Sequence, residues 1–302
     1  MIDISLWGGA DAVTIDAVVE RVRSTADAGL GAMWFPQTAG LDILTALAVA
    51  AYAVPGIKLG TAVVPIQGRH PIPLAQQALS VADAAGPNRF TLGVGVTHAV
   101  VSEGWYGIPY RGIVDLCAEE VQALAALLGP DRHVDLVGQH LVARMTIGLR
   151  VAPPELVLAA LGPRMLEIAG RFADGTVTWM TGPKTLAQSI VPRIRQAAAS
   201  AGRPSPRVIA GLPVWLTDSP DEARTKLAPS MAGAATMPSY RAMLASEGVG
   251  DPTEIALVGN QATIQAGLAR LEDSGVTELL ANLAGPPEEQ VRTRAFLASL
   301  IP

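Results

Sequence analysis

His98 is the residue that its type and position best suit to chemistry. It follows the apolar run Phe90–Val94 and two glycines, Gly93 and Gly95, so it comes shortly after a predicted buried strand. Histidine titrates near physiological pH, and a well-placed proton donor contributes about 10²–10⁴ to a rate. We therefore expect His98 to donate a proton or to make a polar contact with a bound ring. The alternative is a loop histidine that caps backbone groups.

The other reactive side chains form no recognisable catalytic or metal-binding set. His70, His98, His133 and His140 show neither His-x-His nor His-Glu-x-x-His spacing, which argues against a metal centre. Cys117 lies in a helical pattern, where a small buried side chain is expected. The chain has no Gly-x-Ser-x-Gly elbow and no Gly-Lys-Ser/Thr phosphate loop. His70 precedes a proline and is expected to begin a helix.

Composition limits the classes of partner. The chain of 302 residues is 50% hydrophobic and 16% charged, with a net charge of −5 and no block of Lys or Arg. This predicts a large buried core and argues against nucleic acid or an anionic membrane surface as the partner. The segment Met1–Trp7 lacks a leader pattern, and apolar runs such as Ile43–Val54 are too short to span a bilayer. One cysteine excludes an internal disulfide framework, so we expect a cytoplasmic protein with a small-molecule substrate.

Strand and helix patterns alternate along the chain. Core strands are expected at Ile2–Trp7, Ala32–Phe35, Ile57–Val64, Phe90–Val94, Leu156–Ala160, Thr176–Met180, Val208–Leu216 and Glu278–Asn282. Helices are expected at Thr14–Gly29, Asp42–Ala53, Pro73–Ala85, Ile113–Leu128, Arg164–Phe172, Thr185–Ala201, Thr263–Ser274 and Glu288–Leu300. A hairpin is expected at His133–Val137 and His140–Val142, and an irregular helical stretch at Asp221–Glu247. Eight apolar strands separated by helices predict a (β/α)8 TIM barrel, as a single domain over residues 1–302.

A Rossmann-type sheet is the main alternative. Its fingerprint needs Gly-x-Gly-x-x-Gly and an acidic residue at the end of the next strand. In Gly93–His98 the histidine stands where the third glycine belongs, and Asp115 opens a helix rather than ending a strand. In a barrel, the carboxyl ends of the strands build the active site, so His98 and Val63–Val64 are expected on one rim. Without a metal, nucleophile or phosphate loop, such a barrel is best suited to hold a bulky planar cofactor.

Several of these segments resemble the luciferase-like superfamily, and within it the oxidoreductases that use the deazaflavin coenzyme F420. The resembling segments are Met33–Gln37, Leu59–Pro65, Arg69–Pro71, Arg89–Gly95, Ala159–Pro163 and Ala169–Gly175. Their order follows that of the family, and the resemblance covers nearly the whole chain, most weakly in the C-terminal third. It implies an (α/β)8 barrel, usually a homodimer, that binds its cofactor at the carboxyl ends of the strands.

The resemblance also implies which residues bind the cofactor. A non-prolyl cis peptide would join Ala62 and Val63 and support the ring. The phosphate would lie at the start of the helix after Gly162, because helix N-termini attract anions. Arg164 would pair with the phosphate or be a solvated surface residue, and Lys184 would reach the acidic tail or be simple surface charge. The full expected cofactor set is Gln37, Thr38, Ala62, Val63, Val64, Gly95, Thr97, Ala160, Leu161, Gly162, Pro163, Arg164, Thr181, Gly182 and Lys184.

The chain departs from the family pattern at positions that decide the reaction. Dehydrogenases of this family have an Asp-His or similar pair after strand two, where this chain has Gln37–Thr38, and neither side chain takes a proton from an alcohol near neutral pH. We therefore expect reduction of an activated C=C or C=N bond of a neutral, hydrophobic substrate, with Trp7, Tyr106 and Trp179 lining its pocket. An FMN-dependent monooxygenase and a non-catalytic F420-binding protein are the alternatives.

Overall fold

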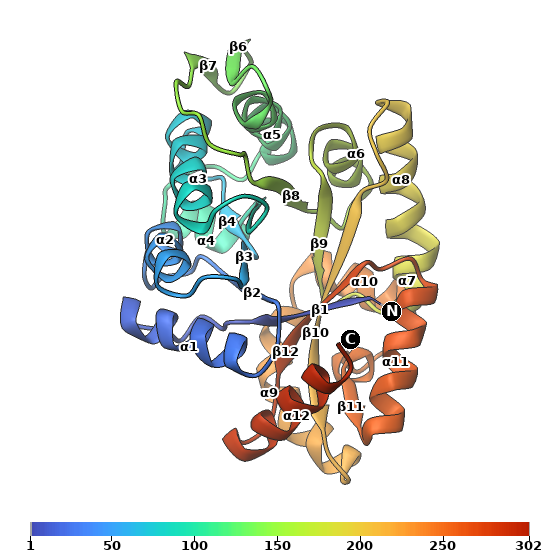
Figure 1. Cartoon of the computed structure of the whole chain (residues 1–302). Coiled ribbons are helices and arrows are strands. Elements are labelled where there is room, and N and C mark those ends of the chain that lie inside the picture. Colours follow the sequence, from blue (N-terminus) through green and yellow to red (C-terminus); the bar gives the residue numbers. More distant parts are fainter. Residues whose placement is uncertain (1, 302) are drawn as a thin grey trace.

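Eight parallel strands pair in a closed ring in the computed structural model, which describes residues 2–301 (Figure 1). In order around the ring they are β1 (Asp3–Trp7), β2 (Ala32–Phe35), β3 (Lys58–Thr61), β5 (Phe90–Gly95), β8 (Glu155–Ala159), β9 (Gly175–Trp179), β10 (Arg207–Leu216) and β12 (Glu278–Leu283). β12 returns to β1 with the register Ile4↔Leu279. The predicted (β/α)8 barrel is therefore confirmed.

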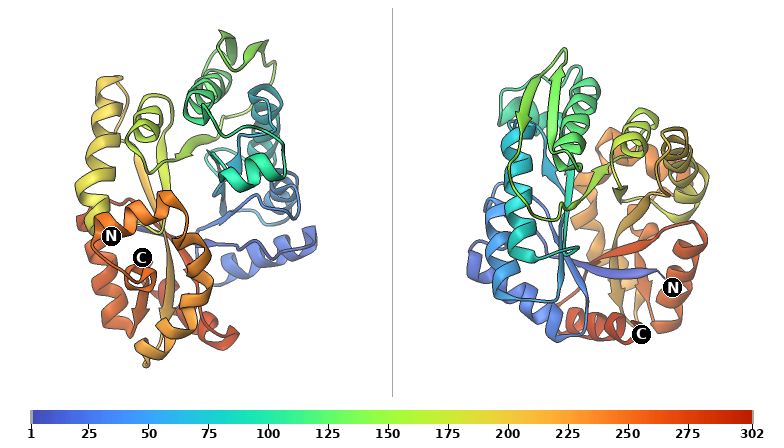
Figure 2. Two further views of the ribbon diagram at one scale, coloured as in Figure 1. Left: turned by 180° about the vertical axis from the view of Figure 1, so that it is seen from behind. Right: turned by 45° about the horizontal axis from the view of Figure 1, so that its top comes forward.

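Helices surround this ring on the outside, as both views in Figure 2 show. Those that follow the ring strands include α1 (Ile15–Asp27), α2 (Ile43–Ala53), α3 (Pro71–Ala85), α5 (Ile113–Leu128), α6 (Pro163–Phe172), α8 (Val191–Ser200) and α12 (Pro287–Ser299), and α11 (Gln261–Asp273) precedes β12. His70 caps α3, since its Nδ1 accepts the N–H of Ile72 at 3.3 Å, which confirms its predicted helix-starting role. No helix among the described residues is both long and apolar enough to cross a membrane.

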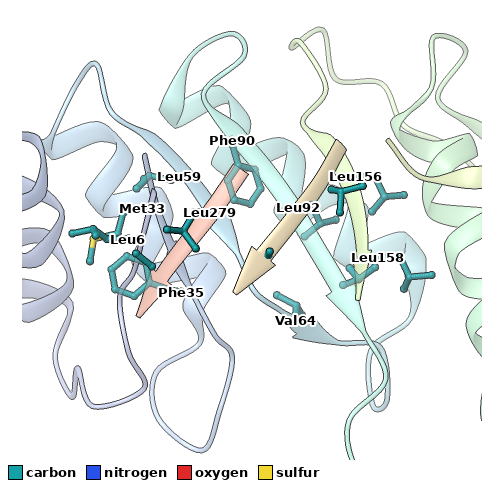
Figure 3. Close-up of a cluster of buried hydrophobic side chains, with 14 of the residues drawn as sticks. Leu6, Met33, Phe35, Leu59, Val64, Phe90, Leu92, Leu156, Leu158 and Leu279 are labelled. Atoms are coloured by element: carbon teal, nitrogen blue, oxygen red, sulfur yellow. The ribbon is translucent and has the colours of Figure 1, made fainter. Parts of the chain in front are cut away.

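Alternation along the strands separates two apolar layers. Outward side chains such as Leu6, Phe35, Leu92 and Leu158 pack between barrel and helices (Figure 3). A smaller set fills the interior of the barrel: Trp34, Val157, Val177, Ile209 and Leu280. Two glycines give the interior tryptophans room. A Cβ on Gly60 would lie 2.3 Å from the Trp34 ring, and one on Gly211 would lie 2.8 Å from the Trp179 ring.

The expected strand Ile57–Val64 is interrupted. It ends as β3 at Thr61 and resumes as β4 (Val64–Pro65), with a cis peptide between Ala62 and Val63, as the family resemblance predicts. The pairing with β5 shifts by one residue across this break, from Gly60↔Thr91 to Val64↔Val94. This is a bulge, which turns local side chains to a new direction. The Thr61 hydroxyl holds it by donating to Gly93 O and accepting from Gly93 N, both at 2.8 Å.

Other predicted elements need correction. The hairpin pairs β6 (His133–Val137) with β7 (Val142–Thr146), so the expected second strand, His140–Val142, was placed too early. The reason is Glu119 on α5, whose carboxylate accepts the backbone N–H groups of residues 139, 140 and 141 and holds them in the turn. The hairpin projects beside α5 at the edge of the molecule (Figures 1 and 2).

Three regions contain elements that periodicity did not resolve. A short helix, α4 (Ala99–Gly104), follows β5 directly. The expected helix Thr185–Ala201 is three consecutive pieces, α7 (Pro183–Thr185), a π-helical turn η1 (Leu186–Ile190) and α8. The stretch 221–247 forms α9 (Pro220–Ala235) and α10 (Pro238–Glu247), and then a 3-10 turn η2 (Pro252–Ile255) leads into a short strand, β11 (Leu257–Gly259), that extends the pairing of β10.

Candidate functional site

Small inward-facing residues form a floor at the carboxyl end of the barrel. Ala62 and Val63, between β3 and β4, and Ala159, at the end of β8, pack on the interior cluster and remain partly exposed. Gly95, at the end of β5, lies between them, since a Cβ there would be 3.0 Å from both Val63 Cγ2 and Ala159 Cβ. Three strand ends therefore meet without a bulky side chain. We call Ala62, Val63, Gly95 and Ala159 the rim floor.

Two tryptophans stand beside this floor. Trp7 ends β1 and Trp179 ends β9, and their rings stack with centroids 5.9 Å apart and planes at 28°. The structure thus brings both predicted pocket tryptophans together at the barrel mouth. A groove of about 620 Å³ borders Trp7, but it runs along the outside of the barrel between α1 and α12, where Arg21 and Arg294 line it, and so it is distinct from the rim floor.

His98 lies at the same rim, just after β5. Its backbone starts α4 by accepting the N–H groups of Val101 and Ser102, but its ring makes no capping hydrogen bond, which excludes the capping alternative. The ring is half-buried and meets the Tyr240 ring of α10 edge-on, with centroids 5.8 Å apart. Burial lowers the pKa of His98 and raises the pKa of Tyr240. Both side chains are therefore neutral near pH 7, and His98 gains a proton only in more acidic solution.

Gln67 is a rim residue that sequence reasoning missed. It follows β4 and is 3% exposed, and its Oε1 accepts the Thr97 N–H at 3.0 Å. Its Nε2 has no hydrogen-bond partner among the described residues. Leaving such a buried donor unpaired costs about 1–3 kcal/mol. No local pattern marks Gln67, because its partner lies 30 residues away.

The start of α6 can receive an anion. Gly162 is its N-cap and Pro163 its first residue, and no side chain caps the free N–H groups of its first turn. A Cβ on Gly162 would meet nothing within 4 Å, so the approach is open. The field of a helix N-terminus favours negative charge here. Arg164 is largely exposed and pairs with Asp115 of α5 at 2.5 Å, so the predicted phosphate-binding arginine already has an anionic partner.

The start of α7 does not fit the same expectation. The Glu247 carboxylate of α10 accepts the N–H of Lys184 at 3.1 Å and both the N–H and hydroxyl of Thr185 at 2.7 Å. A Cβ on Gly182 would lie 2.3 Å from this carboxyl group, and the Thr181 hydroxyl is turned to Trp179 O. The chain thus supplies its own anion to this helix end, and the contact of Thr181, Gly182 and Lys184 with the acidic tail stays a prediction.

Other predicted residues serve the scaffold. The Gln37 amide builds the loop after β2, since Oε1 accepts Ile43 N–H at 2.8 Å and Nε2 donates to Leu41 O at 3.1 Å and to Thr38 O at 3.3 Å. Val64 and Ala160 face the outer apolar layer, not the rim, because they alternate with inward neighbours. Their side chains therefore point away from the rim, and a contact of the cofactor with their backbone groups stays a prediction. Leu161 is partly exposed beside Gly162, and Tyr106, in the loop after α4, lies over Gly68.

The opposite end of the barrel is closed by charge pairs. A cavity of about 590 Å³ there is lined by Arg207, Glu155 and Glu278, among others. Arg207 pairs with both carboxylates, at 2.5 Å for Glu278, and Glu278 also accepts the Trp34 indole N–H at 2.9 Å. These groups satisfy one another, as expected for the stabilising end of such a barrel. The described residues contain no cluster of His, Cys, Asp and Glu able to hold a metal.

Comparison with known proteins agrees with this architecture. A Mycobacterium tuberculosis protein named for coenzyme F420-dependent oxidoreductase activity is 29% identical over 182 residues, 55% of this chain and 51% of that protein. The chain spans about half the length of the curated relatives it matches. Two solved structures share the fold. An F420-dependent secondary alcohol dehydrogenase with an F420–acetone adduct has a TM-score of 0.83, 16% identity and coverage of 100% and 98% of the two chains.

The second structure is the coenzyme F420-dependent tetrahydromethanopterin reductase of Methanopyrus kandleri. Its TM-score is 0.80 at 18% identity, with 98% of this chain and 97% of that one covered. At these identities the two likenesses show the fold alone. The family model of the luciferase-like monooxygenases, however, matches residues 1–294. The chain therefore belongs to the luciferase-like monooxygenase family.

Proposed function

We propose that this protein is an F420-dependent oxidoreductase, in which the bound deazaflavin gives or takes a hydride at C5 of its ring. The observation that carries the proposal is the rim floor. Ala62, Val63, Gly95 and Ala159 place only small apolar groups at the ends of three strands, which suits one face of a planar tricyclic ring. The cofactor named for the mycobacterial relative supports the same choice.

The chain's own residues would orient the cofactor. The rim floor would support one face of the ring, and the stacked Trp7 and Trp179 would wall the site and exclude water. The uncapped first turn of α6, after Gly162 and Pro163, would receive the phosphate. Arg164 would either stay on Asp115 or exchange that carboxylate for the phosphate.

His98 is the proposed proton donor to the substrate. It lies on the rim at the end of β5, its ring makes no capping bond, and Tyr240 limits its movement on one side. The end of β2 offers no comparable base, because the Gln37 amide is engaged in its own loop. We therefore propose reduction of an activated C=C or C=N bond in a neutral, hydrophobic substrate, not oxidation of an alcohol.

The first experiment is a titration of the purified protein with oxidised F420 and, in parallel, with FMN, followed by fluorescence quenching. We expect micromolar or tighter binding of F420 and weaker binding of FMN. Gly95→Val should weaken F420 binding at least about tenfold, because its methyl groups would occupy the rim floor. Gly250→Val, at an exposed position with open space around it, is the matched control.

An FMN-dependent monooxygenase is the second candidate, because the matching family model is described as luciferase-like monooxygenase. Preference for FMN together with substrate-dependent oxygen uptake would move the protein to that class. F420 binding without turnover over a panel of enones and imines would instead indicate a non-catalytic binding protein. Binding of neither cofactor would overturn the proposal.

A further inference from the structure

The side-chain amide of Gln67 is oriented unambiguously. The Thr97 N–H can only donate, so the group 3.0 Å from it must be the amide oxygen, and the NH2 group is the end left over. This NH2 is buried and finds no acceptor among the described residues. The hydrogen bond from the Thr97 N–H needs only the oxygen of the amide. A side chain with an acceptor and no NH2 group would bind Thr97 equally well, so this bond gives the NH2 group no role.

The position of Gln67 ties it to the rim floor. The N–H of the preceding residue, Ile66, donates to Gly95 O at 3.0 Å, so the chain at 66–67 runs beside the end of β5. Gly95 is part of the rim floor, and Thr97 directly precedes His98. The other buried side-chain atoms without a partner, in Glu120, Arg132 and Thr253, belong to α5, the turn before β6 and η2. Gln67 is the one of these four that lies between the carboxyl ends of β4 and β5.

We propose that Gln67 is a cofactor-binding residue whose NH2 group donates a hydrogen bond to a carbonyl oxygen on the edge of the bound ring. The proposal rests on the proposed function and extends it. A deazaflavin carries carbonyl acceptors on its pyrimidine edge, and these would complete the hydrogen bonding of the amide. The same side chain would then link the ring, through Thr97, to the backbone that carries His98.

Two variants separate the nitrogen from the oxygen. Gln67→Glu keeps an acceptor for the Thr97 N–H and replaces the donor with a second oxygen, whereas Gln67→Met removes both. We expect at least a tenfold loss of F420 affinity in Gln67→Glu and a three- to tenfold loss in Gln67→Met. Gln76→Glu, on the exposed face of α3, makes the same change of charge away from the rim and should bind F420 as the unaltered protein does.

A measurement on the unaltered protein removes any dependence on how the variants fold. The side-chain NH2 signals of Gln67 in a 15N–1H spectrum, assigned by their loss in Gln67→Met, should shift on addition of oxidised F420, while those of Gln76 should not. Saturable F420 binding with unmoved Gln67 signals, or with unchanged affinity in both variants, would overturn this inference alone. Failure of the unaltered protein to bind F420 would overturn the proposed function, and this inference with it.

Discussion

At the residue scale, one histidine at the carboxyl end of the barrel, His98, lies where burial disfavours its protonated, charged form. His98 is half-buried against Tyr240, and this burial lowers its pKa below the ordinary value of about 6.5. A histidine that donates a proton must first carry it as the imidazolium ion, so the fraction of His98 able to donate grows as the pH falls. Tyr240 stays neutral over the same range, because burial raises its pKa. The pH profile should therefore report His98.

We expect the rate of substrate reduction to rise as the pH falls from about 8 to 5.5, with a midpoint below about 6.5. In His98→Gln this rise of the rate at low pH should disappear, and the rate itself should fall about 10²-fold. His133→Gln, on the β6–β7 hairpin where the ring bonds Thr146 Oγ1 at 2.8 Å, should keep the profile. Steady-state rates across this pH range test the prediction. The same pH dependence of the rate in His98→Gln as in the unaltered protein would contradict it.

The same burial affects stability with a defined sign. The folded-state pKa of His98 is below its unfolded value, so the unfolded chain binds more protons. The contribution to stability is complete above the unfolded pKa of about 6.5 and is lost as the pH falls from there through the lower folded-state pKa. Rates at the acidic end therefore need a parallel check that the protein stays folded.

At the scale of one element, three carboxyl groups on α5 have three different sets of partners. Asp115 pairs with Arg164 of α6, and Glu119 binds three backbone N–H groups of the hairpin turn. Glu120 is 5% exposed, and its Oε2 has no partner among the described residues. Burial, together with the charge of Glu119, raises the pKa of Glu120 to about 8. A carboxyl group in this state stabilises the fold only while it is protonated.

Glu120→Gln should therefore raise the free energy of unfolding, by about 1–4 kcal/mol at pH 8 and by little near pH 4.5. The sign follows because the folded pKa of Glu120 exceeds its unfolded value, so stability falls as the pH rises from about 4.5 to 8. Denaturant unfolding at pH 5 and pH 8 measures the difference.

Glu119→Gln is the matched comparison and should have the opposite sign. Desolvation alone would raise the pKa of Glu119, but the N–H groups of His140, Gln139 and Leu141 lower it overall. Removing its charge should destabilise the hairpin turn at neutral pH. A Glu120→Gln variant that is no more stable at pH 8 than the unaltered protein would contradict the assignment of Glu120 as a buried neutral acid.

At the scale of the whole molecule, one end of the barrel is stabilised by ion pairs and the other end carries the candidate active site. Arg207, Glu155 and Glu278 tie one end with paired charges, while the other end presents the rim floor, two tryptophans and His98. The outer surface also carries large apolar side chains. On α2, Val49 is 44% and Tyr52 84% exposed, one helical turn apart, and Val13 nearby in the chain before α1 is 79% exposed. The exposed apolar side chains of α2, Val49 and Tyr52, are a candidate contact surface.

We expect the homodimer that the family resemblance implies, with Tyr52 in its contact. Tyr52→Asp should then shift the protein to the monomer, because a charge would be buried in the contact. Val291→Asp, which replaces an exposed apolar residue of α12, should leave the dimer intact. Sedimentation or light scattering over a range of protein concentrations measures both. A monomeric unaltered protein, or a dimeric Tyr52→Asp variant, would contradict this prediction.

The sequence by itself determined the barrel, its eight ring strands and the main helices around them, because apolar periodicity and capping residues such as His70 act over a few neighbouring positions. The ordered family segments also located the cis bond after Ala62. Only the tertiary structure placed Tyr240 against His98, the Glu247 carboxylate at Thr185, and the Gln67 amide at Thr97. Each of these contacts joins residues at least 30 positions apart, so no local periodicity encodes it. Closure of the barrel brings these side chains together, and with them the polar detail of the rim.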